Sequence, residues 1–202
     1  MVYLPVKPLL DWRAIALYGL TLRAITDADQ PFLAQLYAST REDELAVLDW
    51  SPEQKTSFLE MQFHAQHTFY MGQFQQATFD IIELTQDSLN AASLNKDEKP
   101  NRKDTKLDRK NEKIPIGRLY LEQRSDEIRI IDIALLPPHR NQGIGTRLLN
   151  MILAKGQQLN VPVRIHVEQF NPALRLYLRL GFQAIEEQGI YYLMEWLPQV
   201  QL

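Results

Sequence analysis

One stretch decides the fold of this chain: Leu135-Leu136-Pro137-Pro138-His139-Arg140-Asn141-Gln142-Gly143-Ile144-Gly145-Thr146. It connects an apolar run over 127–136 to a turn with two glycines and then to a helical apolar pattern over 143–158. The two prolines end the run, and glycine lets a backbone turn tightly beside a ligand. A helix that starts there exposes N–H groups and the positive end of its dipole. The stretch therefore predicts a strand, an anion-binding turn and a helix, with a phosphate as the preferred anion.

Comparison with known phosphate loops narrows this prediction. A P-loop requires Gly-Lys-Ser/Thr, whereas Gly145 is followed by Thr146 and Arg147. The dinucleotide fingerprint requires a third glycine where Leu148 stands. Neither loop is present. Because Arg140 adds a charge-assisted contact to the two glycines, phosphate binding is still favoured over a helix start without a ligand.

The apolar pattern on both sides of this stretch predicts alternating strands and helices. The predicted strands are 20–25, 77–84, 116–122, 127–136, 161–167, 182–185 and 190–196, and the predicted helices are 28–39, 51–74, 143–158 and 171–181. The strands from 77 to 136 have hairpin-like connections, whereas strand, helix and strand alternate afterwards. We therefore expect an α/β fold with a central mixed sheet of about six to seven strands and about four flanking helices.

One domain over 20–198 is expected, preceded by an N-terminal extension at 1–19 and interrupted by a charged insertion at about 85–113. Within 95–113 there are eight Lys or Arg and five Asp or Glu, and apolar residues nearly vanish. The insertion lies between two strand patterns, so we interpret it as a solvated loop and not as a domain linker. Contact of its lysines with an acidic partner is the alternative.

Composition excludes several classes of protein. The chain has 202 residues, 45% of them hydrophobic, and a formal net charge of −3, which suits one packed core and argues against nucleic acid as a partner. It contains no cysteine, so disulfides, cysteine-bound zinc, iron–sulfur clusters and a thiol nucleophile are excluded. Prolines and charges interrupt the apolar N-terminus, and we expect a cytoplasmic protein that does not span a membrane.

The loop motif Arg140-x-x-Gly143-x-Gly145 resembles the R/Q-x-x-G-x-G/A pyrophosphate loop of the GNAT superfamily of acetyl-CoA-dependent N-acetyltransferases. Two neighbouring features strengthen the resemblance. The strand over 131–137 precedes the loop as it does in the family, and Asn171-x-Ala173-x-x-x-Tyr177-x-x-x-Gly181-Phe182 resembles a family motif after the next strand. The resemblance extends over about 20–196, and the insertion at 85–113 departs from it.

The resemblance implies an enzyme that transfers the acetyl group of acetyl-CoA to a primary amine by direct attack in a ternary complex. It requires acetyl-CoA as co-substrate, an amine acceptor that is a small molecule or a peptide, and no metal. The implied cofactor-binding residues are Leu135, Leu136, Arg140, Asn141, Gln142, Gly143, Ile144, Gly145, Thr146, Asn171 and Tyr177. Since the chain has no cysteine, a covalent acetyl-cysteine relay is impossible.

Tyr177 is the candidate general acid, because a phenol can protonate the departing thiolate of coenzyme A. Its alternative role is helix–sheet packing, since Ala173, Tyr177 and Gly181 share one helical face. Asn171 likewise has a structural alternative as a helix cap ahead of Pro172.

The general base is open among three residues. His166 and Glu168 alternate onto one face of the strand 161–168, and Asp132 lies inside an apolar strand where it requires a partner. The structural alternatives are a hydrogen-bonded strand histidine and a pair between Asp132 and Arg164. A metal site at His64 and His67 is discounted, because no third ligand is evident.

Segment 41–53 is strongly acidic, with Glu42, Asp43, Glu44, Asp49 and Glu53 against one arginine. In the family that this chain resembles, the corresponding region commonly lines the side of the fold where the acceptor binds. A cationic acceptor is therefore our hypothesis. The rival function is a non-catalytic acyl-CoA-binding sensor or interaction module. The identity of the acyl group and the presence of a homodimer are left open.

Overall fold

The computed structural model describes Leu10, Ala16 and residues 19–85 and 112–199. Most of the expected N-terminal extension and nearly all of the charged insertion lie outside the described residues. The insertion's two ends are described: Thr85 and Lys113 pair with each other as the last residue of one strand and the first of the next. No helix in the described ranges is long and apolar enough to cross a membrane.

Seven strands form one sheet in the order β1-β2-β3-β4-β5-β7-β6. Only the β4–β5 pair is parallel, so the sheet is mixed, as the sequence predicts. The strands are β1 (Leu20–Ala24), β2 (Thr78–Thr85), β3 (Lys113–Gln123), β4 (Ile128–Leu135), β5 (Val163–Glu168), β6 (Gln183–Gln188) and β7 (Tyr191–Trp196). Strand β3 begins earlier than the pattern predicts, because a bulge opposite Glu83 accommodates Pro115.

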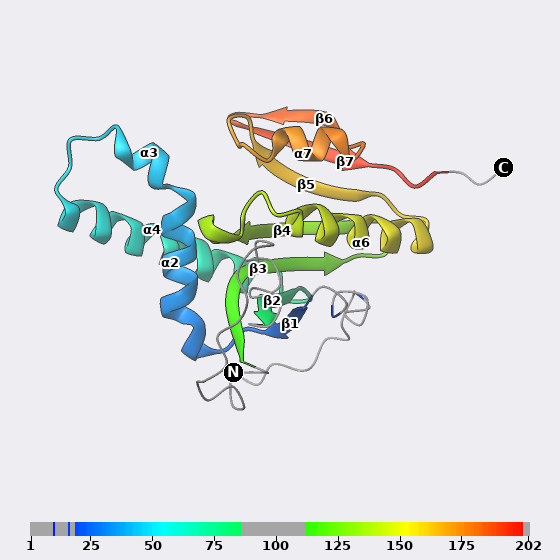
Figure 1. Cartoon of the computed structure of the whole chain (residues 1–202). Coiled ribbons are helices and arrows are strands. Elements are labelled where there is room, and N and C mark those ends of the chain that lie inside the picture. The colour runs from blue at the N-terminus through cyan, green and yellow to red at the C-terminus, as the bar shows by residue number, and fades with distance from the viewer. Residues whose placement is uncertain (1–9, 11–15, 17–18, 86–111, 200–202) are drawn as a thin grey trace, which may run out of the picture.

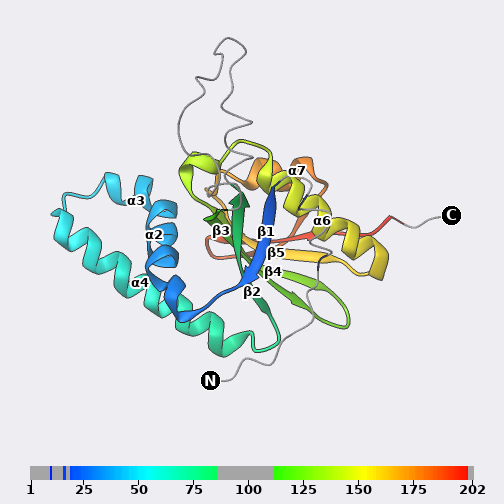
Figure 2. The ribbon, with the colours of Figure 1, turned by 60° about the horizontal axis from the view of Figure 1, so that its bottom comes forward.

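Helices cover both faces of the sheet (Figures 1 and 2). The helices are α2 (Gln30–Thr40), α3 (Glu42–Ala46), α4 (Pro52–Gln73), α6 (Ile144–Leu159) and α7 (Leu174–Arg179). The short helix α3 was not expected, and α7 begins three residues after the predicted start at 171. Ser51 caps α4 by accepting a hydrogen bond from the Gln54 N–H, as its position before Pro52 indicates.

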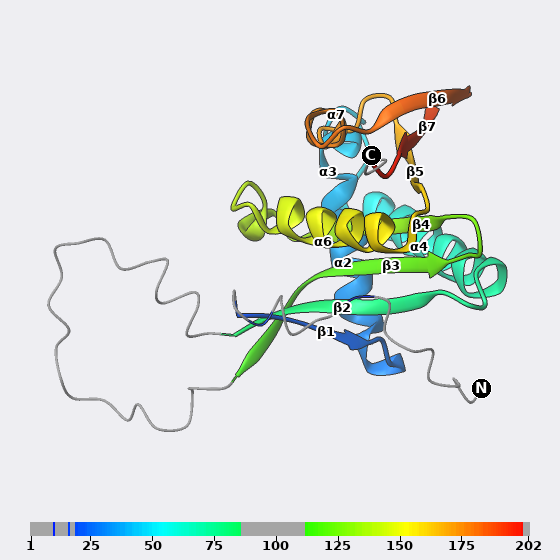
Figure 3. The same cartoon turned by 90° about the vertical axis from the view of Figure 1, so that its right-hand side faces the viewer.

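Two apolar layers hold the helices on the sheet. The larger layer joins α6 and Tyr177 of α7 to the strands, and its fully buried members include Leu148 and Ile152 of α6. The other joins Leu33 of α2 and Phe63 of α4 to β2. Figure 3 shows α6 in front of β4, with β1, β2 and β3 below it and β5, β6 and β7 above it. The fold is therefore a three-layer arrangement with the sheet in the middle.

Strands β4 and β5 pair at their beginnings and diverge toward their ends (Figure 1). Their last paired residues are Ile130 and Ile165, although β4 continues to Leu135 and β5 to Glu168. We call these diverging ends, residues 131–135 and 166–168, the β4–β5 fork. A bulge in β4 at Ile131, where the register with β3 shifts, coincides with the start of the fork. Bulges increase local twist and bend a strand, which accounts for the divergence.

The same bulge redirects Asp132. Ile128 and Ile130 face the α6 layer, and a regular strand would turn Asp132 to that apolar face as well. The extra residue changes the alternation, so Ile133 and Leu135 contact the α6 layer instead. The Asp132 carboxylate lies on the opposite face, against Arg118 and Tyr70 of α4. The bulge thereby gives this carboxylate the polar partners that burial requires.

Candidate active site

The turn between β4 and α6 presents a row of free backbone amides. Asn141 and Gly143 adopt the left-handed conformation, with φ of 59° and 78°. The first amide to bond into the helix is that of Arg147, which donates to the Gly143 carbonyl over 3.0 Å. The N–H groups of residues 141–146 have no hydrogen-bond partner among the described residues. A run of free amides at a helix N-terminus can hold an anion such as a pyrophosphate.

A glycine is required at position 143 because of its backbone conformation, and not because a side chain would clash there. A Cβ added there meets no described atom within 4 Å, yet the φ of 78° disfavours any other residue. The space beside Gly143 is therefore open to a ligand that approaches the backbone.

The structure gives Arg140 a more structural role than the sequence predicts. Its Nε donates to the Leu135 carbonyl over 2.8 Å, and its Nη2 donates to the carbonyl and hydroxyl oxygens of Ser39, each over 3.0 Å. Arg140 therefore ties the end of β4 to the C-terminal end of α2. Its Nη1 group has no partner among the described residues and is the part of the side chain available to a phosphate.

The open edge of β4 offers different amides from those expected. The Leu136 N–H donates to the Ile116 carbonyl of β3 over 2.9 Å, so it does not face the fork. In an antiparallel ladder successive residues alternate their direction, and the Leu135 and Ile133 N–H groups point away from β3 toward the fork. The Leu135 N–H therefore points into the fork and the Leu136 N–H does not. Ile133 offers a second N–H there and was not among the candidates, because the bulge that sets the register carries no clear sequence signal.

Tyr177 of α7 is buried beside the fork, with its ring in an edge-to-face contact with Phe182 at 5.6 Å. Its hydroxyl has no hydrogen-bond partner among the described residues. Burial, and then the negative charge of Asp132, raise the pKa of Tyr177 well above its usual range. The phenol is therefore fully protonated at neutral pH, and packing and acid chemistry are both compatible with its position.

Asn171 has a structural contact that the sequence anticipates. Its Oδ1 accepts a hydrogen bond from the Ala173 N–H over 2.8 Å and so orders the turn that leads into α7. The side-chain N–H₂ group remains for other contacts.

The two carboxylate candidates for the base are both held by arginines. Arg118, whose side chain is 4% exposed, donates to the two Asp132 oxygens over 3.1 and 2.8 Å. Arg41, between α2 and α3, donates to the two Glu168 oxygens over 2.9 and 3.1 Å. Each carboxylate therefore already accepts two charge-assisted hydrogen bonds from its arginine. The expected pair of Asp132 with Arg164 is wrong, since Arg164 binds Glu127 and Glu195.

His166 lies on the exposed face of β5 where the fork begins. Its Nδ1 is 3.2 Å from Nη1 of Arg129, and within the described residues no carboxylate is in hydrogen-bond contact with the ring, although Glu186 and Glu127 act on it through their charge. Partial desolvation, and then the Arg129 charge, lower the pKa of His166. The imidazole is therefore neutral at pH 7 and able to accept a proton.

The two histidines of α4 have different surroundings. Nε2 of His67 is 2.9 Å from the Gln30 side-chain nitrogen, and His64 is exposed. Across the part of the chain that the structure describes, no group of three His, Asp or Glu side chains is placed to hold a metal ion.

Comparisons with known proteins agree on one family. The profile described as Acetyltransferase (GNAT) family matches residues 78–182, slightly more than half of the chain. That range includes β2 to β5, the loop before α6, and Tyr177. A search of curated proteins found no match.

Solved structures share the fold at low sequence identity. The PaiA N-acetyltransferase of Thermoplasma acidophilum, in complex with coenzyme A, has a TM-score of 0.55 and 15% identity over 88% of this chain and 98% of that one. The spermidine N-acetyltransferase of Vibrio cholerae, in complex with CoA and spermine, has a TM-score of 0.50 and 20% identity over 89% of this chain and 95% of that one. These similarities confirm the predicted fold. With the profile match, they establish that the chain belongs to the GNAT family of acetyltransferases.

Proposed function

We propose that this protein is an N-acetyltransferase that transfers the acetyl group of acetyl-CoA to a primary amine by direct attack in a ternary complex. The observation that carries the proposal is the run of free amides at 141–146, placed directly beyond the open edge of β4. The loop amides suit a pyrophosphate and the adjoining strand edge suits an extended chain with amide groups; in coenzyme A the pyrophosphate is followed by such a chain, the pantetheine arm.

Acetyl-CoA would occupy the fork in an orientation set by these groups. The amides of residues 141–146 would hold the pyrophosphate, and the Ile133 and Leu135 N–H groups would face the pantetheine along β4. This orientation would direct the thioester toward Tyr177. A backbone N–H at the fork can donate to the thioester oxygen as negative charge develops on it.

In the transfer step the amine nitrogen attacks the thioester carbonyl carbon. A C–N bond forms, the C–S bond breaks, and the coenzyme A thiolate accepts the proton of the Tyr177 hydroxyl. The attacking nitrogen releases one N–H proton to the general base or to water, and Tyr177 regains a proton from solvent before the next turnover. Burial raises the pKa of Tyr177. A thioester bound beside it would also be shielded from water, and desolvation disfavours a free thiolate as it disfavours a phenolate, which would favour transfer of the proton to the departing sulfur.

The acceptor must lose a proton before it attacks, since an alkylammonium has a pKa of about 10. Among the three candidate bases, the contacts favour His166, because Asp132 and Glu168 are each held by an arginine. In this proposal Asp132 keeps the Tyr177 proton in place through its charge, and Glu168 anchors the end of β5.

Thermal unfolding with and without acetyl-CoA tests the cofactor site. At 100 times Kd the ligand should stabilise the protein by about 2.7 kcal/mol, a shift of several degrees. Gly143→Glu should abolish the shift, because it strains the turn and places a carboxylate against the pyrophosphate. Gly189→Glu is the matched control, since Gly189 has a φ of 60° and equally open space but lies in the β6–β7 turn. Absence of a shift in folded, ligand-free protein would refute the proposal.

A further inference from the structure

The C-terminal end of α2 contacts both strands of the fork. Ser39 is the second-to-last residue of α2, and Arg41 directly follows the helix. The carbonyl and hydroxyl oxygens of Ser39 accept hydrogen bonds from Arg140, which also donates to the Leu135 carbonyl at the end of β4. Arg41 donates to both carboxylate oxygens of Glu168, the last residue of β5. Two residues that are close neighbours in the sequence therefore hold the end of β4 and the end of β5.

These contacts connect the two strands where strand pairing does not. The ladder between β4 and β5 ends at Ile130 and Ile165, and the strands diverge beyond it. Figure 1 shows the end of α2 that leads into α3 beside this diverging part of the sheet. We call Ser39 and Arg41 the clasp. Because the ladder does not reach the strand ends, contacts with the clasp set the distance between them.

The clasp is held by the last turn of its own helix. The Ser39 hydroxyl donates to the Leu36 carbonyl over 2.7 Å, and the Arg41 N–H donates to the Ala38 carbonyl over 3.0 Å. The side chains of Arg41 and Glu168 are 25% and 24% exposed, so solvent screens their pair only partly. An arginine that donates to both oxygens of a carboxylate also has a defined geometry. The clasp is therefore a fixed connection between the strand ends.

The proposed path of acetyl-CoA lies between the two strand ends that the clasp holds. Arg140 can direct its Nη1 group at the pyrophosphate only while Ser39 and the Leu135 carbonyl hold its other nitrogens. The pantetheine has to fit between the open edge of β4 and the end of β5. A wider fork would separate these two surfaces, so a cofactor in contact with one would lose contacts with the other.

We propose that Ser39 and Arg41 are positioning residues that set the width of the fork for acetyl-CoA, Ser39 through Arg140 and Arg41 through Glu168. The inference rests on the proposed function, because it concerns the same cofactor site. The most specific consequence concerns Arg41, which binds β5, whereas the cofactor loop follows β4. Loss of the Arg41 side chain should weaken acetyl-CoA binding even though it leaves the loop unchanged.

Calorimetric titration of the full chain with acetyl-CoA tests the clasp. Arg41→Met and Glu168→Gln should each weaken binding by about tenfold, because both remove the same contact with β5. The two substitutions change the net charge in opposite directions. Long-range attraction of the anionic cofactor would therefore shift the two affinities in opposite directions, whereas loss of the clasp shifts both in the same direction. The double variant should bind about as weakly as either single variant.

Conservative variants separate positioning from general stability. Arg41→Lys should recover part of the affinity, since an ammonium can still bind Glu168, although without the two-pronged geometry of arginine. Ser39→Ala keeps the carbonyl that accepts from Arg140 and removes only the hydroxyl contact, so it should weaken binding by about two- to threefold. Thermal unfolding without ligand, measured on every variant, shows which of them are folded at the temperature of the titration.

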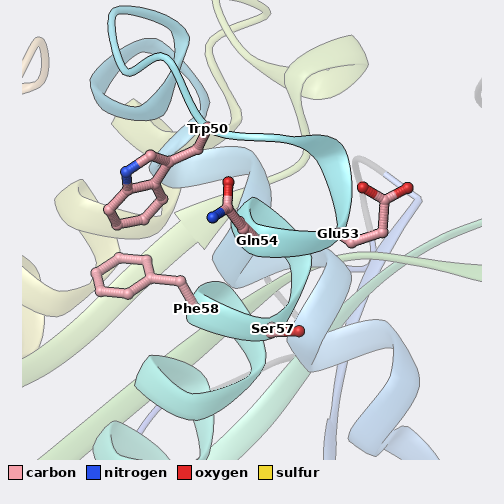
Figure 4. A pocket seen from close by; sticks show the side chains of 5 residues that line it. All are labelled: Trp50, Glu53, Gln54, Ser57 and Phe58. Atoms are coloured by element: carbon pink, nitrogen blue, oxygen red, sulfur yellow. The ribbon is translucent and has the colours of Figure 1, made fainter.

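Two substitutions outside the clasp are matched controls. Arg164→Met also removes an arginine that binds two carboxylates, and its side chain is 28% exposed, but it lies where β5 is paired with β4. Glu53→Gln also removes one negative charge. Glu53 lines a surface hollow at the start of α4 together with Trp50 and Phe58 (Figure 4), and its carboxylate accepts a hydrogen bond from the Ser51 hydroxyl. Both controls should leave acetyl-CoA affinity within about twofold of that of the unaltered protein.

Unchanged acetyl-CoA affinity in the Arg41 and Glu168 variants would overturn the inference. Shifts of opposite sign in these two variants would also overturn it, because they would indicate long-range charge, and an equal loss in the Arg164 variant would do so by indicating general loss of stability. An unaltered protein that binds no acetyl-CoA would refute the proposed function, and the clasp with it. Normal binding by the unaltered protein without an effect of the clasp variants would refute the clasp alone.

Discussion

The two sides of the β4–β5 fork are built by different means. On the side of α6, the binding groups are consecutive backbone amides at 141–146, arranged by two left-handed residues within one loop. On the opposite side, the polar groups are side chains that meet across long stretches of sequence, as Arg41 and Glu168 do from 127 positions apart. A backbone site depends on local conformation, whereas the opposite side depends on the partners that the fold brings together. The following predictions test this difference.

The largest effect is expected where a buried side-chain partner is removed. Arg118→Met should lower the free energy of unfolding by about 3–5 kcal/mol, because the half-buried Asp132 carboxylate loses the buried arginine that donates to both of its oxygens. Arg124→Met is the control, since its side chain is 40% exposed and its pairs should contribute below about 1 kcal/mol. Denaturant unfolding at pH 7 measures both. Equal losses in the two variants would show that burial of the Arg118 pair is unimportant.

Tyr177→Phe should lower kcat by about 100-fold or more with little change in acetyl-CoA affinity, because it removes the proposed acid and keeps the packing ring. Tyr120→Phe is the matched control: this tyrosine is also buried, and its hydroxyl lacks a hydrogen-bond partner within the described residues. Steady-state kinetics with an amine acceptor and acetyl-CoA titration supply the two measurements. An unchanged kcat for the Tyr177 variant would remove the acid role and favour the packing interpretation.

The contributions of two aspartates to the stability of the protein should change with pH in opposite directions. Asp29 is bound by Arg23 of β1, and Asp80 lies in β2. Hydrogen bonds from Arg23 lower the pKa of Asp29 to about 2, and burial raises the pKa of Asp80 to about 6. The Asp29 contribution is present above pH 4 and is lost as pH falls toward 2, whereas Asp80 reduces stability as pH rises from about 4 to 6.

At pH 7, Asp29→Asn should therefore destabilise the protein and Asp80→Asn should stabilise it, each by roughly 2 kcal/mol. Thermal and urea unfolding at pH 7 and at pH 4 measure the difference. If the two variants shifted stability in the same direction at pH 7, the contrast between Asp29, which an arginine binds, and Asp80, whose pKa burial dominates, would be wrong.

The smallest effect is expected on catalysis when the proposed general base, His166, is replaced. His166→Gln should lower kcat/KM by about tenfold and remove its decline below pH 6.5, since water can reach the exposed ring position and carry the proton instead. His64→Gln, at an exposed position of α4, should leave the pH profile unchanged. A decline that persists in the His166 variant would assign it to another group.

The sequence predicted more of the α6 side of the fork, where the proposed cofactor loop lies, than of the opposite side. Gly143 and the helix that follows it were identified, because a glycine turn between an apolar strand and an amphipathic helix is a local pattern. Arg41 and Arg118 were missed, and the assigned partner of Asp132 was wrong. An arginine has no local signature of the carboxylate it will meet, so sequence spacing could not identify either pair.

The sequence alone determined the order of strands and helices, the mixed sheet and the glycine turn, because apolar periodicity and backbone preferences act over a few neighbouring residues. Only the tertiary structure decided that β4 bulges at Ile131, that Leu135 and not Leu136 faces the fork, and that Arg140 binds Ser39. These features depend on the register of neighbouring strands and on contacts between distant segments. Such contacts form only when the whole chain buries its apolar surface, so no short stretch of sequence carries them.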